Sequence, residues 1–312
     1  MHRYSFVLYR PLQLIPVLFG ISVLSFVLVK SIPGDPVRLL LGTKSTPEAV
    51  ARIRALYGLD EPLVTQYLYY LKNLSIGEMG QSMLYKMPVL PLIAERVAPT
   101  LFLVIGSVLL TLAIALPLAS LAALKRGSWI DHAIRGFTTA GLGFPAFWLG
   151  IMLIILFSVK LGLFPVAGYG ETVLEQLHHM ILPCLTVALA LSAVVTRNLR
   201  ASMIAELASD HATAARAKGL PESWVFRRHV LPNSLIPTIN LLAINVGWLI
   251  GGSVVVETVF SLPGMGQLLV RSIFTRDYMV VQGVTLVFAC ATVLLNFIAD
   301  LLTVAADPRV KL

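Results

Sequence analysis

The stretch "TAARAKGLPESWVFRRHVLPN", residues 213–233, is a basic segment set in an otherwise strongly apolar chain. Gly219 predicts a left-handed helix stop, and Pro221 followed by Glu222 predicts the start of a second short helix. That second helix is expected to end before Pro232. The segment therefore predicts a small helical hairpin whose basic side chains are Arg216, Lys218, Arg227, Arg228 and His229.

The rest of the chain has the composition of a membrane protein. Of its 312 residues 57% are hydrophobic and 13% are charged, and the mean hydropathy is +0.84. A water-soluble domain of this size does not keep such a balance. The net charge of +8 is explained by basic residues retained on the cytoplasmic side of a bilayer, so we expect lipid and not nucleic acid as a partner.

Uncharged runs of about the length needed to cross a bilayer occur six times. They are residues 12–29, 98–124, 137–159, 180–196, 234–256 and 278–299. The first run is longer than the apolar region of a usual signal peptide and no small-residue cleavage site follows it, so it is interpreted as an uncleaved span. The sequence predicts an all-α integral membrane protein with six transmembrane helices.

Lysine and arginine in the short connections indicate the orientation. With the N-terminus inside, the inside segments hold 13 of these residues and the two short outside loops hold three. Because cytoplasmic loops carry an excess of Lys and Arg, both termini and the 213–233 hairpin are predicted to be cytoplasmic.

The long segment after the first span is predicted to be a small external helical subdomain. Ser45 with Glu48 suggests one capped helix that ends at Gly58, and Asp60 is expected to cap a second helix reaching about Leu74. We therefore divide the chain into residues 1–96, the first span with this subdomain, and residues 97–312, a transmembrane core.

The six apolar runs contain no Asp, Glu, Lys, Arg or His. Because ionisable residues inside a membrane mark ion and proton sites, their absence from the runs disfavours an ion-coupled secondary transporter and an intramembrane enzyme. The asparagines at 240, 245 and 296 and the glycines of "GWLIGG" are ordinary features of helix packing, but they also suit a polar, water-accessible path.

Catalytic and metal-binding motifs are not found. The chain has no phosphate-binding loop and no G-x-S-x-G elbow, so we expect no catalytic residue and no ATP hydrolysis on this chain. His178 and His179 are adjacent without Cys or carboxylate at helical spacing, which is a weak metal signal, and no metal site is predicted.

The hairpin itself has two interpretations on these grounds. The fourth span is expected to continue as a polar helix from Arg197 to Lys218, followed by the short helix with Trp224 and Phe226. Such a basic amphipathic element either lies on lipid headgroups or docks into a groove of a partner protein.

The hairpin resembles the EAA loop of ABC importer permeases, whose pattern is Glu-Ala-Ala, three residues, Gly, nine residues, Ile, one residue, Leu-Pro. The matching positions are Ala214, Ala215, Gly219, Leu231 and Pro232. Thr213 stands in place of the Glu and His229 in place of the Ile, two departures that resemble the dipeptide, oligopeptide, glutathione and nickel branch. Strings such as "IPGDPVRLL", "FPAFWLG" and "GGSVVVETVFSLPGMGQLLVRSI" also resemble this branch and occur in its order.

The resemblance implies a type I ABC importer permease fold in a bacterial inner membrane. It implies a cytoplasmic coupling loop at about residues 205–233 that docks into a separate ATPase, with Ala214, Ala215, Arg216, Lys218, Gly219, Leu220, Pro221, Leu231 and Pro232 as its residues. Two ATPase subunits would carry ATP and magnesium, so no cofactor is expected on this chain. A homologous second permease, expected as a heterodimer partner, and an external substrate-binding protein would complete the complex.

For the substrate, the resemblance favours short peptides, with nickel chelates, glutathione and opines as alternatives. The external subdomain and the loop at residues 261–267 are expected to receive the binding protein. The path is expected between the two permeases, lined by the third and fifth spans, and no individual lining residue is predicted.

Overall fold

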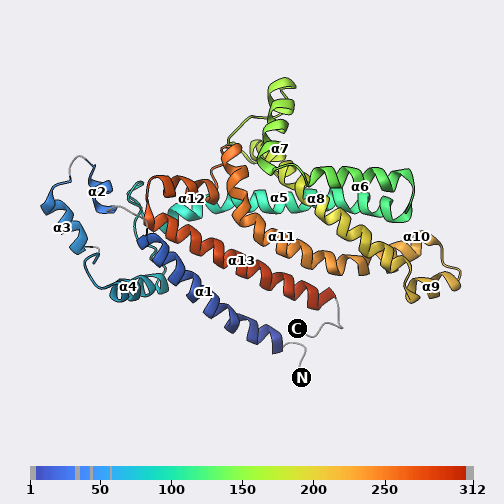
Figure 1. The fold of residues 1–312 in the computed structure, drawn as a ribbon, viewed down its shortest axis with the longest axis horizontal. Helices are drawn as coiled ribbons and strands as arrows, with labels where there is room; N and C mark the ends of the chain where they lie inside the picture. Colours follow the sequence, from blue (N-terminus) through green and yellow to red (C-terminus); the bar gives the residue numbers. More distant parts are fainter. Residues whose placement is uncertain (1–4, 32–35, 43–44, 57, 307–312) are drawn as a thin grey trace.

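The computed structural model describes residues 5–31, 36–42, 45–56 and 58–306, and these are almost entirely helical. The elements are α1 (Ser5–Ser31), α2 (Pro36–Leu41), α3 (Pro47–Leu56), α4 (Leu63–Ser75), α5 (Val89–Leu124), α6 (Trp129–Gly141), α7 (Ala146–Leu153), the π-helix η2 (Ile154–Lys160), α8 (Val173–Leu207), α9 (Asp210–Ala217), α10 (Glu222–Val225), the π-helix η3 (Phe226–Val230), α11 (Leu231–Val259), α12 (Met265–Phe274) and α13 (Tyr278–Ala306). The molecule is elongated, with α2–α4 at one end and α9 and α10 at the other (Figure 1).

Each of the six predicted runs lies in a helix or in a bent pair of helices. By length and composition, the described residues contain four helices that can cross a membrane, or five when the bent pair is counted as one span. The first predicted span lies within α1, whose stretch Ile15–Val27 is a shorter apolar helix by the same measure. The all-helical membrane fold is thus confirmed, whereas the count of six is not reproduced.

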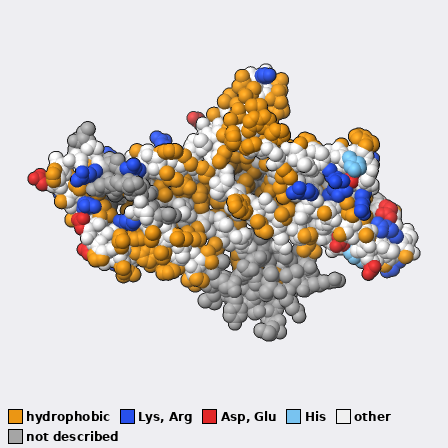
Figure 2. Space-filling view, viewed as in Figure 1, with side chains coloured by type: hydrophobic (Ala, Val, Ile, Leu, Met, Phe, Trp, Pro, Cys, Tyr) orange, Lys and Arg blue, Asp and Glu red, His pale blue; other side chains and the backbone are white. Residues whose placement is uncertain are grey.

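The run 137–159 is not one straight span, as the sequence had suggested. α6 and the continuous α7–η2 helix meet at an angle of 103°. Pro145 is the N-cap of α7, and its φ of −62° and ψ of 140° lie outside the helical region. Proline also disfavours the helical conformation at the residue before it, which is Phe144. As a result α7 and η2 project from the body as an arm, covered with hydrophobic side chains (Figures 1 and 2).

The core of the molecule is the parallel packing of α5 and α8. The thiol of Cys184 on α8 lies 3.8 Å from the carbonyl oxygen of Leu103 on α5, and Ser120 and Met203 approach further along both helices. Gly106 permits this approach, because a Cβ at that position would lie 2.7 Å from Cys184 Sγ. Small residues at an interface let two membrane helices come close enough to pack tightly.

A buried ion pair joins α6 to α8 at the hairpin end. Asp131 accepts two hydrogen bonds of 2.6 Å from the guanidinium of Arg200, one to each carboxylate oxygen. The backbone N–H of Gly127 donates a third bond of 3.0 Å to the same carboxylate. Such bidentate, fully bonded geometry is what makes a buried ion pair tolerable, so α6 is anchored along α8.

Two buried carboxylates hold α12 at the opposite end. Glu257 accepts hydrogen bonds from Thr100 Oγ1 at 2.8 Å and from the backbone N–H of Gln267 at 2.9 Å, in the first turn of α12. Asp277, just past α12, accepts from Ser82 Oγ and from the backbone N–H of Leu84. Glu257 follows directly on the uncharged run 234–256, and because α11 continues to Val259, this helix does contain an ionisable residue.

The segment predicted to be a helical subdomain contains the helices α2, α3 and α4, but their caps differ from the prediction. Thr46 Oγ1, and not Ser45, accepts the hydrogen bond from Ala49 N at the start of α3. α4 begins after Pro62 without a side-chain cap, so the prediction that Asp60 caps it is wrong. Tyr67 fastens α4 to α1, because its hydroxyl is 2.8 Å from Ser22 Oγ and its ring packs edge-on against Phe26.

We expect Asp131→Ala to lower the free energy of unfolding by about 3–5 kcal/mol, because it leaves the largely buried Arg200 without its carboxylate. The measurement is the melting temperature of the purified protein in detergent. Arg197→Ala, which removes an exposed arginine three residues from Arg200, serves as the control and should change little. An equal fall in both variants would contradict a structural role for the ion pair.

Candidate functional site

The 213–233 hairpin forms as a compact unit at one end of the molecule. α8 stops at Leu207, and Ser209 caps a separate helix, α9, by accepting a hydrogen bond from Ala212 N. The predicted continuous helix from Arg197 to Lys218 is therefore interrupted, because Ser209 offers its hydroxyl as a new N-cap. The interruption lets α9 turn away from the axis of α8 (Figure 1).

Gly219 makes the turn between α9 and α10, as predicted. Its φ is +80°, a backbone conformation that residues other than glycine rarely adopt. Its N–H bonds to Arg216 O at 2.9 Å, and Leu220 N reaches Ala215 O at 3.4 Å. Pro221 then serves as the N-cap of α10.

The second helix does not end before Pro232, which corrects the prediction. α10, η3 and α11 form one continuous helix from Glu222 to Val259. η3 is a π-helical turn, and its last bond runs from Leu231 N to Phe226 O. Pro232 directly follows this π-helical turn, which accommodates the N–H that proline lacks within the continuous helix. The hairpin is therefore built directly onto the α11 span.

A buried cluster fixes the hairpin to the ends of α5 and α8. Its members are small or aliphatic side chains from all these elements: Ala119, Ala123, Leu199, Met203, Ala212, Ala215, Val225 and Val230. Leu220 and Leu231 pack against it, whereas Ala214 is exposed. The two alanines of the motif thus differ in position, since Ala215 faces the molecule itself and Ala214 faces outward.

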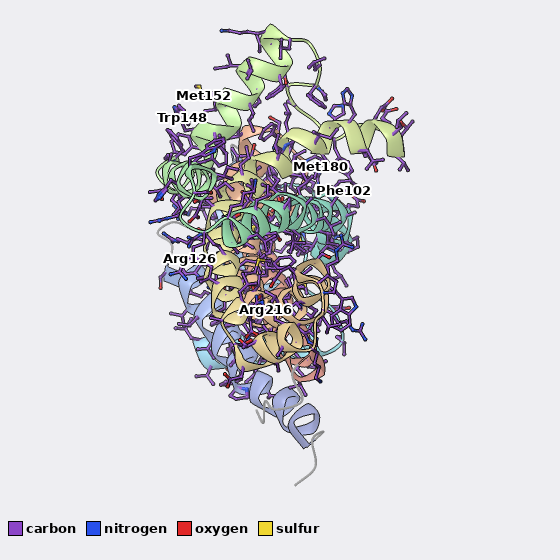
Figure 3. All side chains as sticks on the ribbon, turned by 90° about the vertical axis from the view of Figure 1, so that its right-hand side faces the viewer. Phe102, Arg126, Trp148, Met152, Met180 and Arg216 are labelled. Carbon is purple, nitrogen blue, oxygen red and sulfur yellow. The ribbon has the colours of Figure 1, made fainter. Side chains whose placement is uncertain are left out.

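Arg216 is used within the hairpin. Its Nε lies 2.6 Å from Glu222 Oε1, and its Nη1 donates to Leu207 O at 2.8 Å. These bonds tie α9 to α10 and to the last turn of α8. Arg216 thus has an internal role in the hairpin, and Figure 3 shows this residue near the centre of the hairpin end.

The outward surface of the hairpin is basic. Lys218, Arg227, Arg228 and Pro232 are exposed. Trp224 is 43% exposed, and its ring packs edge-on against the ring of His229 at 5.2 Å. The two departures from the EAA pattern have local roles here, since His229 supports Trp224 and Thr213 Oγ1 donates to Ser209 O at 3.0 Å.

A second feature, which the sequence only hinted at, is an open groove between α11 and α13. Its volume is about 400 Å³, and it is lined by Ile244, Gly247, Trp248, Gly251, Thr292 and Asn296. Residues of the "GWLIGG" string supply one wall and α13 supplies the other. The glycines and asparagines in the sequence indicated a polar surface on these helices. That residues of α11 and α13 line the same groove could not be predicted from the sequence.

The loop at residues 261–267, expected to receive a binding protein, is largely buried. Leu262, Gly264, Met265 and Gly266 are all inaccessible. Gly264 lies directly against the Glu257 carboxyl group, since a Cβ at this position would be 2.4 Å from it, and the neighbouring Gln267 N–H donates to the same carboxylate. Among the other candidates, His178 Nε2 lies 2.9 Å from Leu163 O, which gives this residue a structural contact.

Comparisons with known proteins agree with the fold. Residues 115–312 match the family described as "Binding-protein-dependent transport system inner membrane component", and residues 3–115 match its N-terminal domain. The glutathione transport system permease protein GsiC of Escherichia coli K12 is 40% identical over 307 residues, covering 98% of this chain and 99% of that protein. The GsiC proteins of Shigella dysenteriae and Shigella boydii match to the same extent.

Solved structures show the same fold at low sequence identity. The inward-facing MetNI methionine ABC transporter matches with a TM-score of 0.54 and 19% identity over 69% of this chain and 96% of that one. An amino acid ABC transporter solved with histidines matches with a TM-score of 0.52 and 16% identity, over 68% and 93%. Both likenesses concern the fold alone.

The helical architecture, the hairpin between α8 and α11 and the match along nearly the whole chain lead to one assignment. This chain belongs to the binding-protein-dependent transport system inner membrane components, as an ABC importer permease of the dipeptide and oligopeptide type.

Proposed function

We propose that this chain is the membrane subunit of an ATP-driven importer that forms part of the path for short peptides. The observation that carries the proposal is the hairpin, which is exposed and basic outside but fixed by a buried cluster inside. A rigid element of this kind transmits a push from a partner, whereas a segment lying on lipid needs no such anchoring.

The hairpin is the joint to a separate ATPase subunit. Ala214 allows close approach, and Lys218, Arg227 and Arg228 attract acidic groups on the partner. Gly219, Leu220, Pro221, Leu231 and Pro232 set the shape of the hairpin, and Ala215 and Arg216 hold it together. ATP and magnesium belong to two ATPase subunits, and this chain itself is not catalytic.

The orientation follows the distribution of basic residues. Both termini and the hairpin face the cytoplasm of a bacterial cell, and α2–α4 face outward, where an external binding protein delivers the substrate. A homologous second permease, encoded as a distinct chain, completes the path. The family description, which names a binding-protein-dependent transport system, supports the presence of a binding protein in this complex.

The substrate class rests on the relatives. The permeases that are 40% identical are named for glutathione, which is itself a tripeptide. Short peptides, glutathione among them, are therefore the substrates we put first. Nickel chelates and opines are the alternative substrates, and a nickel chelate is the one used in the test below.

For the joint, we expect Ala214→Glu to leave the protein folded but to reduce ATP-dependent uptake at least about tenfold, because an exposed charge blocks the contact with the ATPase. Ala215→Glu should lower thermal stability as well, since it places a carboxylate in the buried cluster. Ala133→Glu, at an exposed alanine of α6, is the matched control. Normal uptake by the Ala214 variant would show that the hairpin does not dock there.

For the substrate, the complete complex is reconstituted in proteoliposomes with its binding protein. We expect glutathione or tri-alanine to stimulate ATP hydrolysis and to accumulate inside, with nickel–histidine having no effect. Stimulation by the nickel chelate alone would reject peptides as the substrate. Uptake that persists without the ATPases and collapses with the proton gradient would reject the importer itself in favour of a secondary transporter.

A further inference from the structure

The groove between α11 and α13 lies halfway along both helices. Ile244, Gly247, Trp248 and Gly251 occupy the middle of α11, and Thr292 and Asn296 occupy the middle of α13. Each helix has 29 residues, about 43 Å at 1.5 Å per residue, against about 30 Å of bilayer hydrocarbon. The groove is therefore at the depth of the membrane interior.

The chemistry of the groove does not suit lipid. Asn296 is exposed, and within the described part of the chain its side-chain amide has no hydrogen-bond partner. An unpaired amide in hydrocarbon costs several kcal/mol, so this face requires water or a polar molecule in front of it. Thr292 Oγ1 donates to Phe288 O at 2.8 Å and keeps lone pairs that can accept.

The shape of the groove suits a small molecule better than another helix. Gly251 would meet nothing within 4 Å if it carried a Cβ, so the space above it is open. Trp248 lies beside Gly247 and Gly251 and is 80% exposed. Its bulky side chain hinders the backbone of another helix from packing closely against these glycines. A volume of about 400 Å³ lies within the range of small-molecule sites.

We propose that this groove is the chain's own part of the translocation path and holds short peptides in transit through their amide and ammonium groups. The six lining residues carry no ionisable side chain, so selection here acts on the peptide backbone and tolerates varied side chains. The amide of Asn296 bonds peptide groups, and the indole of Trp248 attracts the terminal ammonium. This inference rests on the proposed importer function.

The position of the groove also links it to the hairpin. α10, η3 and α11 are one continuous helix, so Pro232 of the hairpin and Ile244 of the groove are joined by twelve residues of helix, about 18 Å. A displacement of the hairpin therefore moves one wall of the groove relative to α13. A movement of the ATPase subunit that displaces the hairpin is therefore passed along α11 to the groove.

Thiol accessibility tests the proposal in the reconstituted complex. Gly251→Cys and Asn296→Cys are made in a background with Cys184→Ala and Cys290→Ala whose peptide uptake has been verified. A small water-soluble maleimide, admitted to both faces of the vesicles, should label both at least about tenfold faster than Leu294→Cys, because thiols react as thiolates in water. Leu294 is exposed on the same helix but lies about 200° around it from Asn296.

Tri-alanine delivered by the binding protein should slow labelling at residues 251 and 296 several-fold and leave residue 294 unchanged. Labelling rates equal to that of residue 294 would overturn the proposal in favour of a lipid-facing surface. Cross-linking of either cysteine to the second permease without maleimide labelling would overturn it in favour of a helix interface. Labelling without peptide protection would also overturn it, and in each case uptake measured on the same vesicles reports separately on the importer function.

A bulky substitution gives an independent test. Gly251→Leu should fold normally, because the space above Gly251 is open, but should reduce uptake of tri-alanine at least about tenfold by filling the groove. Gly136→Leu on α6, at a glycine that also meets nothing within 4 Å, is the matched control. Normal uptake by the Gly251 variant would contradict a path through this groove.

Discussion

The contact between α5 and α8 is the interaction on which the rest of the structure depends. Gly106, at the middle of α5, lets this helix approach Cys184 of α8, and the last turns of both helices supply the buried residues against which the hairpin packs. α6 is bonded to α8 through Asp131 and Arg200. Thr100 on α5 accepts a hydrogen bond from Met265 N of α12 and donates one to Glu257 of α11. In a bilayer, where lipid is as apolar as a leucine side chain, such close packing and polar pairing hold helices together.

One continuous helix, α10–η3–α11, connects both candidate sites. Its first turns are anchored to the ends of α5 and α8 by the buried cluster, and its later turns pass the groove. Within the hairpin, Arg216 and Glu222 stabilise the turn internally and leave Lys218, Arg227 and Arg228 free to face a partner. In the proposed importer, the ATPase subunit pushes on this basic surface of the hairpin, and α11 transmits the movement to the groove.

Several sequence predictions were correct because they depend on local chemistry, and several were wrong because neighbours changed the outcome. Gly219 was correctly placed at a left-handed turn, since few other residues adopt φ near +80°. Pro232 was expected to end a helix, but the π-helical turn before it absorbs the missing hydrogen bond. The run 137–159 contained enough apolar residues for a span, yet Pro145 turns it through 103°. Thr46 replaced Ser45 as a cap, a difference of one residue that propensity cannot resolve.

The sequence alone determined the membrane class, the helical runs, the basic hairpin and the family, because hydropathy, charge and motif spacing are properties of the chain in order. Only the tertiary structure decided which residues of the motif face outward, since Ala214 and Ala215 are indistinguishable until Ala215 is seen against α5 and α8. It also decided that Leu262, Gly264, Met265 and Gly266 are buried near Glu257, and that Trp248 and Asn296, which are 48 positions apart, line one groove. Contacts between distant segments depend on how helices pack, and no local pattern encodes that packing.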